Sequence, residues 1–523
     1  MDLVVKLGFL IVFFGLMVFI GFRNRHRTGD VTGFVLGGRD VGPWLTAFAY
    51  GTSYFSAVIF VGYAGQFGWK YGIASTWIGI ANAFLGSLLA WVVLGRRTRV
   101  MTQHLDSATM PQFFEKRFQS HSLKIVASAI IFIFLIPYTA SLYNGLSRLF
   151  GMAFNVPYEV CVIIMAVLTA IYVIAGGYMA TAVNDFIQGI IMLFGIVAVI
   201  AAVLKGQGGF LAALDGLAKV NDPSVSSTPG IFASFFGPDP LNLFGVMVLT
   251  SLGTWGLPQM VQKFYAIKSE QSISKGTIIS TFFAVVVAGG CYFLGGFGRL
   301  FSNVLDPNAS GAPAGGFDNI IPTMLEGLPT ILIAIVVVLV LSASMSTLSS
   351  LVLTSSSTLT LDFLKDLSKK EMDEKKQLFI MRALIVVFIL ISVVIAIIQV
   401  NNNVTFIAQL MGVSWGALAG AFLAPFLYGL YWKRATKASC WVSFLFSTVV
   451  MILNIFFRGS FPKFLQSPIN AGAFCMIAGL VLVPVVSAFT RAPDKAHIGQ
   501  VFSCYERRVT VLAKEAIGDE LAD

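Results

Sequence analysis

Apolar stretches of about twenty residues, the length a membrane-crossing helix needs, recur along this chain up to about residue 490. The first runs from about Val4 to Phe22 and can cross about 30 Å of hydrocarbon as a helix that rises about 1.5 Å per residue. Only 11% of the residues are charged and the mean hydropathy is +0.83, whereas about a quarter of the residues of a soluble domain are charged. The sequence therefore predicts an all-α integral membrane protein.

Apolar length and flanking charge predict about thirteen membrane-crossing helices. The first stretch could be a signal peptide, but such a peptide has its positive charges before the apolar run, whereas Arg23, Arg25 and Arg27 follow this one. We therefore interpret it as a retained helix. The other predicted spans lie near 43–68, 72–94, 124–149, 157–178, 183–204, 241–266, 274–300, 328–356, 378–400, 406–430, 437–457 and 469–490.

The formal net charge of +10 raises the question of a nucleic-acid partner, and the placement of the basic residues answers it. They concentrate in short loops between apolar spans, as the positive-inside rule describes for cytoplasmic loops. The long segment from Gly206 to Pro240 has Lys219 as its only basic residue. We therefore predict an N-terminus outside, a C-terminus in the cytoplasm, and no nucleic-acid partner. The predicted inner loops contain Arg96, Arg97, Arg99, Lys116, Arg117, Lys124, Lys365, Lys369, Lys370, Lys375, Lys376, Lys433, Arg434 and Lys437.

Two predicted spans carry helix-weakening residues at mid-depth. Such residues free backbone groups that hydrocarbon cannot satisfy, so helix breaks persist where they line a site. Either break alone could instead be a packing kink or a contact between small residues. Because they open two successive five-helix sets, they predict inverted repeats with a binding site between them at the midplane. The residues are Gly51, Thr52, Ser53 and Ser56 in the first span, and Gly253, Gly256 and Pro258 in the second.

A third polar cluster lies in the otherwise apolar span near 328–356. Ser346, Ser349 and Ser350 are three and four residues apart and share one helix face, where their hydroxyls could form an oxygen cage for a hard cation. The alternative is a structural cluster in which each hydroxyl bonds back to its own helix. The density of hydroxyls favours the ion site. The cluster comprises Ser342, Ser344, Ser346, Thr347, Ser349 and Ser350.

Asp185 is the only acidic residue near the membrane end of its span. An ionisable residue at that depth is a functional candidate by default. It could also cap the helix that begins at Phe186, a position that aspartate fills well. Both roles are compatible.

Six motifs stand in one order along the chain: LGGRDVGPW at 36–44, GTSYFSA at 51–57, IYVIAGGYMATAVNDFIQG at 171–189, WGLPQMVQKFYAIKS at 255–269, SMSTLSS at 344–350 and GLYWKRAT at 429–436. Together they resemble the solute:sodium symporter family, nearest to its bacterial proline and pantothenate branches. The resemblance implies a LeuT-type 5+5 inverted-repeat core, alternating access and a location in the bacterial inner membrane. It also implies sodium-coupled import of a small polar organic solute, with a carboxylate, a vitamin-like acid or an amino acid favoured.

The resemblance divides the chain into six parts. They are an extra helix and cytoplasmic loop at 1–42, the first repeat at 43–204, an extracellular loop at 205–240, the second repeat at 241–431, two further helices at 432–490 and a cytoplasmic tail at 491–523.

In that family a sodium ion lies between the broken first repeat helix and the eighth core helix. The resemblance implies backbone carbonyls of Thr52, Phe55 and Ala343 and hydroxyls of Ser346 and Thr347 as its ligands. Some members have a second sodium site, so Na+ is the expected coupling ion and a second site is left open. The residues that match the second site are Asp185, Ser346, Ser349 and Ser350.

The solute pocket departs from the proline branch, which has an aspartate at the position of Tyr54 and aromatic residues at Thr250 and Thr254. Tyr54 is more similar to the pantothenate and monocarboxylate relatives. These departures leave the solute open. We expect hydrogen-bonding groups and one aromatic wall near it, supplied by Tyr54, Ser56, Asn82, Thr250, Thr254, Trp255 and Gln259.

Other functions are less well supported. The sequence has no GxxxxGK[ST] phosphate loop, no nucleophile elbow and no paired metal ligands, so an enzyme is not expected. About thirty residues follow the last span, too few for a signalling domain of a sodium-dependent sensor. A sodium/sugar symporter and a channel remain alternatives, and no obligate protein partner beyond the lipid bilayer is expected.

Overall fold

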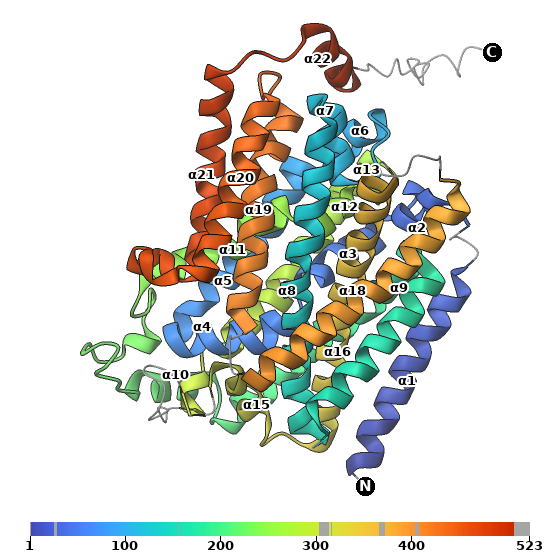
Figure 1. Ribbon diagram of the computed structural model, residues 1–523. Coiled ribbons are helices and arrows are strands. Elements are labelled where there is room, and N and C mark those ends of the chain that lie inside the picture. The colour runs from blue at the N-terminus through green and yellow to red at the C-terminus, as the bar shows by residue number, and fades with distance from the viewer. Residues whose placement is uncertain are drawn as a thin grey trace, which may run out of the picture.

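A computed structural model describes residues 2–25, 29–154, 156–302, 313–314, 316–365, 372–402 and 407–506 (Figure 1). Their regular elements are helices, and β pairing among them is limited to isolated bridges. The prediction of an all-α protein is confirmed. Arg27, Lys369, Lys370 and residues 507–523 of the predicted tail lie outside the described residues.

The helices follow one another through the whole described chain. In chain order they are α1 (Asp2–Arg23), α2 (Val31–Leu36), α3 (Pro43–Tyr54), the π-helical η3 (Val58–Tyr63), α4 (Ala64–Tyr71), α5 (Thr76–Ala81), η5 (Asn82–Leu89), η6 (Trp91–Gly95), α6 (Arg96–His104), α7 (Met110–Phe118), α8 (His121–Phe154), α9 (Tyr158–Gly206), α10 (Phe210–Lys219), α11 (Pro240–Gly256), α12 (Pro258–Ala266), α13 (Glu270–Ala284), η8 (Val285–Gly289), α14 (Gly290–Gly295), α15 (Ile320–Leu325), α16 (Thr330–Thr358), η11 (Leu359–Leu364), α18 (Glu374–Asn402), α19 (Ile407–Tyr431), α20 (Lys437–Phe456), α21 (Pro468–Phe489) and α22 (Lys495–Phe502).

Ten helical stretches of the described chain are long and apolar enough to cross a membrane, and the bent pair α11 and α12 makes eleven. Two of the ten exceed one crossing, with 49 residues in Tyr158–Gly206 and 47 in Val58–His104. Both contain a glycine at positive φ, Gly177 (φ 53°) and Gly72 (φ 62°), a conformation that glycine adopts readily. Counting each as two passes brings the total to the predicted number of about thirteen.

The first predicted helix break lies at the end of α3. Phe55 is extended (φ −86°, ψ 120°) and its N–H donates to the carbonyl of Gly51, after which helix resumes at Ala57. Gly51 itself stays helical. A glycine is needed there because a Cβ would lie 2.4 Å from the ring of Phe283. The break is confirmed, and it falls at Phe55 and Ser56 rather than at the glycine.

The second break separates α11 from α12, which meet at a bend of 44°. Leu257 between them is extended (φ −78°, ψ 122°). It precedes Pro258, whose ring disfavours helical geometry in the residue before it and whose own position suits a helix start. This break is also confirmed, and its cause is the proline.

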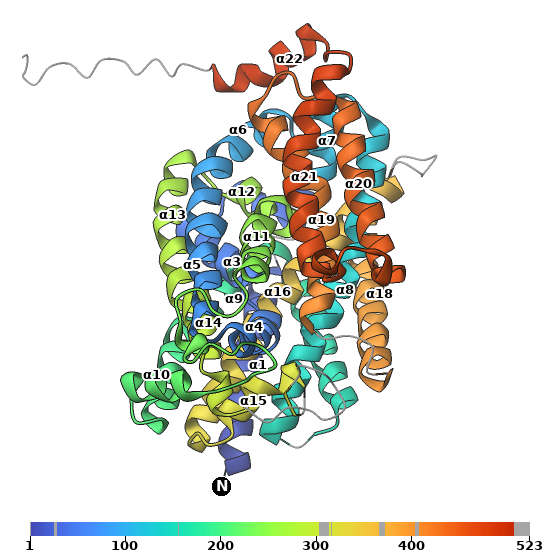
Figure 2. The same cartoon turned by 90° about the vertical axis from the view of Figure 1, so that its left-hand side faces the viewer.

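Burial separates the central helices from the peripheral ones. Of the 18-residue apolar segment in each span, 83% is buried in the span that contains α16 and 94% in α19, whereas 28% is buried in α1. Figures 1 and 2 show that the N-terminus and α10 lie at one end of the molecule, and that α6, α7 and α22 lie at the opposite end. We call them the N-terminal face and the C-terminal face.

Candidate functional site

Five buried oxygens converge where the break of α3 meets α16. The hydroxyl of Ser346 lies 3.0 Å from the carbonyls of both Thr52 and Ala343. The hydroxyl of Thr347 lies 3.1 Å from the carbonyl of Ala343, 3.2 Å from that of Thr52 and 3.5 Å from that of Phe55. All five residues are buried. The structure therefore brings together the whole set expected for the first sodium ion.

The helix break explains why these carbonyls are available. Because α3 ends at Tyr54, the carbonyl of Thr52 accepts from α16 hydroxyls instead of from its own helix. A hard cation takes oxygens at about 2.3–2.6 Å, and oxygens around one such ion lie about 3–4 Å apart. The measured separations fall in that range, so the set fits a single desolvated cation.

The residues expected for a second ion are placed differently. Ser346 faces the first set, and the hydroxyl of Ser349 donates to the carbonyl of Ser346 at 2.9 Å. Ser350 is 2.8 Å from the hydroxyl of Ser53 and accepts from the ammonium of Lys263 at 3.0 Å. Ser350 is therefore connected through Lys263 to Asp185, which lies 3.9 Å from that ammonium.

The residues expected around the solute enclose a very small cavity beside Tyr54, of about 10 Å³. Its lining has no charged side chain. Of the expected residues, Tyr54, Asn82 and Thr254 line it, whereas Ser56, Thr250, Trp255 and Gln259 do not. The remaining lining residues are Tyr50, Gly51, Phe55, Gly86, Ser87, Ser280, Phe283, Ala284 and Ala288.

Two of the residues outside this lining have their side chains bonded to backbone. Thr250 donates to the carbonyl of Val246 at 2.8 Å, and the indole of Trp255 donates to that of Leu85 at 2.9 Å. Other buried polar atoms of this region have no hydrogen-bond partner among the described residues, which leaves them free for a polar solute. They are Tyr54 Oη, Ser56 Oγ, Asn82 Nδ2, both amide atoms of Gln259, Tyr138 Oη, Tyr292 Oη and Trp415 Nε1.

Comparison with known proteins decides the family. The sequence profile described as "Sodium:solute symporter family" matches residues 34–446. The chain belongs to the sodium:solute symporter family. It is a sodium-coupled secondary active symporter that imports a small organic solute by alternating access, and Na+ is its coupling ion.

Similar proteins carry proline in their names. The symporter is 27% identical to the osmoregulated proline transporter OpuE of Bacillus subtilis over 503 residues, which cover 95% of this chain and 96% of the relative. It is 30% identical to the sodium/proline symporter of Staphylococcus aureus over 461 residues, with 85% and 84% covered. These likenesses extend over most of each relative.

Among solved structures, the symporter resembles a substrate-bound, outward-open sodium-coupled sialic acid symporter with a TM-score of 0.75. The sequence identity is 17%, and 94% of this chain and 98% of that chain are covered. The likeness shows the fold, so the predicted LeuT-type 5+5 inverted-repeat core is confirmed.

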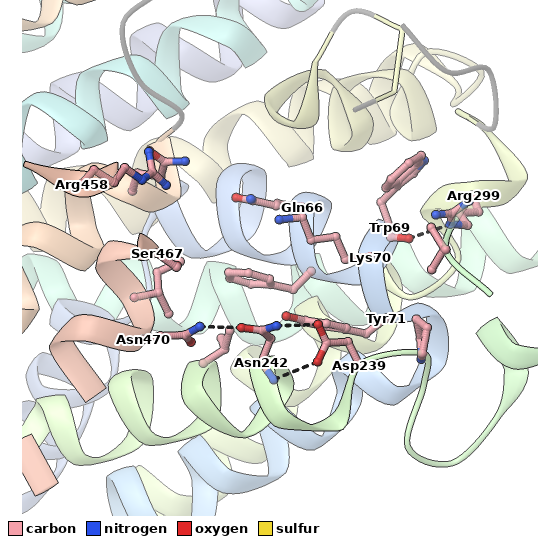
Figure 3. A pocket seen from close by; sticks show the side chains of 16 residues that line it. Gln66, Trp69, Lys70, Tyr71, Asp239, Asn242, Arg299, Arg458, Ser467 and Asn470 are labelled. Atoms are coloured by element: carbon pink, nitrogen blue, oxygen red, sulfur yellow. Dashed lines mark hydrogen bonds between the residues drawn. The ribbon is translucent and has the colours of Figure 1, made fainter. Parts of the chain in front are cut away.

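The symporter has a larger cavity, of about 360 Å³, whose lining includes the first residues of α11 and α21 (Figure 3). Lys70 and Arg458 line it and form no ion pair within the described residues, although Arg458 donates to the carbonyl of Gln466 at 2.7 Å. Asp239 also lines it and caps α11 through the N–H of Asn242 at 3.1 Å. The cavity therefore carries two cations that form no ion pair within the described residues, together with the carboxylate of Asp239.

The rim of this cavity is held by Arg299. Its guanidinium is 3.8 Å from the rings of both Trp69 and Phe232 and pairs with Asp222 at 2.9 Å. Burial by itself would raise the pKa of Asp222, but hydrogen bonds from Ser224 and Arg299 outweigh it and hold that pKa below its ordinary value. The loop before α11 is thereby tied to α4 and to the end of α14.

Hydrogen bonds join α12 and η11 to neighbouring segments of the symporter. Thr354 of α16 donates to the amide oxygen of Gln262 at 2.7 Å, and the amide nitrogen of Gln262 donates to the carbonyl of Val35 at 3.1 Å. Thr109 donates to Asp362 at 2.6 Å. A further cavity, of about 560 Å³, is lined by residues of the C-terminal face, among them Arg96, Arg97 and His104 of α6.

Sequence reasoning missed Lys263, Tyr138 and Trp415. Lys263 lies in a motif quoted for the family, and its depth in a membrane span is itself a signal of function. Trp415 faces Tyr54 with ring centroids 5.8 Å apart and Tyr138 at the same separation. Pro137, which directly precedes Tyr138 inside α8, is a local signal for that tyrosine.

Proposed function

We propose that this symporter binds its sodium ion through the carbonyls of Thr52, Phe55 and Ala343 and the hydroxyls of Ser346 and Thr347. The observation that carries the proposal is the convergence of these five oxygens at the break of α3. An ion there bridges α3 to α16. Tyr54 lies inside the same bridged stretch and lines the solute cavity, so ion and solute occupancy are coupled through residues 52–55.

The proposed solute is a small carboxylate, either a monocarboxylate or an amino acid. Support comes from the wide cavity, where Lys70 and Arg458 attract anions. Proline and sialic acid, which the names of the similar proteins contain, are themselves carboxylates. The narrow cavity offers hydroxyls and amides but no charged side chain. A single carboxylate would therefore be held by neutral donors near Tyr54.

We further propose that the N-terminal face is outside the cell and the C-terminal face cytoplasmic in a bacterial inner membrane. The cations of α6 and α7 on the C-terminal face support this orientation. The repeats are placed at 43–204 and 241–431, with 205–240 as an outer loop. On this proposal the protein is a carrier that acts without an obligate protein partner, and not an enzyme, a sensor or a channel.

Uptake into proteoliposomes tests this proposal. Labelled monocarboxylates, amino acids, vitamin-like acids and sugars are offered with an inward sodium gradient, or with choline replacing sodium. Saturable, sodium-dependent uptake of one carboxylate, with counterflow of labelled against unlabelled solute, is expected. Uptake of a sugar alone would refute the solute class. Uptake that neither saturates nor needs sodium would refute the proposal that the protein is a carrier.

A further inference from the structure

A buried lysine lies where the second sodium ion of the family resemblance would be expected. Lys263 belongs to α12 and is 2% exposed. Its ammonium donates to the hydroxyl of Ser350 at 3.0 Å and lies 3.9 Å from a carboxylate oxygen of Asp185. It also lies 5.1 Å from the ring centre of Tyr178. The cation thus contacts α16 and α9 from the second broken helix.

Within the described part of the chain, no group other than Lys263 neutralises the negative charge of Asp185. Its side chain is fully buried, and neither carboxylate oxygen has a hydrogen-bond partner there. A buried carboxylate is very unfavourable unless a cation is near. Lys263 is the only cation in ion-pair range of it among the described residues. One positive charge is therefore already present for one negative charge.

One hydroxyl of the serines expected for a second ion already contacts the lysine. Ser349 donates to the carbonyl of Ser346, and the hydroxyl of Ser346 itself faces the carbonyls of Thr52 and Ala343. Ser350, which belongs to the expected second set, accepts from Lys263. The ammonium therefore lies between Ser350 and Asp185, where it competes with a free sodium ion for both groups.

Electrostatics favour the lysine over an added ion. An ammonium and a sodium ion carry the same charge, so either neutralises Asp185. Adding sodium while Lys263 is charged leaves an excess positive charge in a water-poor interior, where like charges repel strongly. A cation covalently attached to α12 also loses no translational freedom on occupying the site.

We propose that the ammonium of Lys263 is a tethered cation that replaces a second sodium ion at Asp185, so that the symporter binds one sodium ion per cycle. The proposal deepens the proposed function and rests on the sodium site between α3 and α16. Lys263 then carries its charge with α12 as the helices rearrange, instead of taking a second ion from solution.

Binding of ²²Na+ to the purified full-length protein in nanodiscs tests the proposal without knowledge of the solute. Wild type is expected to bind one sodium ion per chain, and Lys263→Arg, which keeps the charge, is expected to do the same. Lys263→Met frees Asp185 and is expected to bind two. The double variant Lys263→Met with Asp185→Asn removes both charges and is expected to return to one.

Two results would overturn the proposal. One is a wild-type protein that binds two sodium ions and falls to one in Asp185→Asn, which would mean that sodium occupies the site beside the lysine. The other is a folded Lys263→Met variant that still binds one. If Lys263→Met does not fold, the wild-type count with Asp185→Asn decides alone. Loss of all binding in Ser346→Ala with Thr347→Ala reports on the first site instead, which keeps the two proposals distinguishable.

Discussion

Removing one hydroxyl from α16 should weaken sodium binding in a way that the geometry quantifies. In Ser346→Ala the lost oxygen is one of five, 3.0 Å from two of the other four. A contact with a charged group contributes about 1.5–3 kcal/mol. At about 1.4 kcal/mol per factor of ten, the sodium dissociation constant should rise about tenfold to about 150-fold. Thr52 keeps a donor in Thr347 at 3.2 Å, so the sodium-free fold should persist.

Ser344→Ala is the matched control. It removes a serine hydroxyl from the same buried helix, two residues before Ser346 and on a different face of α16. Its hydroxyl donates to the carbonyl of Val340 at 2.8 Å, inside its own helix, and contacts no carbonyl of α3. Sodium affinity should therefore stay at the wild-type value, and any loss of stability should be independent of sodium.

Thermal unfolding at increasing sodium, with choline keeping the ionic strength constant, measures both variants. A ligand that binds only the folded state stabilises it by RT ln(1 + [Na+]/Kd). The stabilisation curve of Ser346→Ala should move to about 10–150-fold higher sodium, and that of Ser344→Ala should not move. Equal shifts in the two variants, or no shift in either, would refute the placement of the ion.

Three further changes test other parts of the structure. Tyr54→Phe should weaken the solute by about 1.5–3 kcal/mol if the hydroxyl meets a charged group and by about 0.5–1.5 kcal/mol if it meets a neutral one, with sodium binding unchanged; a loss confined to sodium would contradict it. Asp222→Asn should destabilise the protein at pH 7 by about 1.5–3 kcal/mol. Because the folded pKa of Asp222 is lowered, the wild-type advantage is complete above about pH 4 and disappears as the pH falls through that lowered pKa; an advantage that survives at lower pH would rule out the pair with Arg299. Gly68→Ala places a Cβ 2.0 Å from backbone of α14 and should cost at least about 1–3 kcal/mol in thermal stability, whereas Gly8→Ala in α1 meets nothing within 4 Å and should be neutral; equal midpoints would contradict the close packing.

The sequence was most informative where a residue type has one backbone consequence. Pro258 predicts the second break because it restricts Leu257, and the structure has the break there. Glycine was less informative. Gly51 marks the right helix but serves to admit the ring of Phe283, and the backbone opens at Phe55. A glycine can signal either conformational freedom or close packing, and only the neighbouring helix distinguishes the two.

The features that the sequence did not predict depend on contacts between residues far apart in the chain. Spacing places Ser346, Ser349 and Ser350 near one face, but it does not say which hydroxyl bonds back to its own helix, as Ser349 does. The proximity of Lys263 to Asp185 depends on how α12 packs against α9, 78 positions away in sequence. The family resemblance supplied the sodium ligands, and it assigned no role to Lys263.

The small cavity beside Tyr54 has a consequence for affinity. Its volume of about 10 Å³ admits about one water molecule, whereas sites for small ligands enclose about 300–1,000 Å³. If the solute binds beside Tyr54 as proposed, this conformation is too small for it, and the solute would bind an expanded conformer. If that conformer makes up one part in a hundred, the apparent dissociation constant is about a hundredfold larger than the intrinsic one. A substitution that only enlarges the expanded population would then tighten solute binding without adding a single contact.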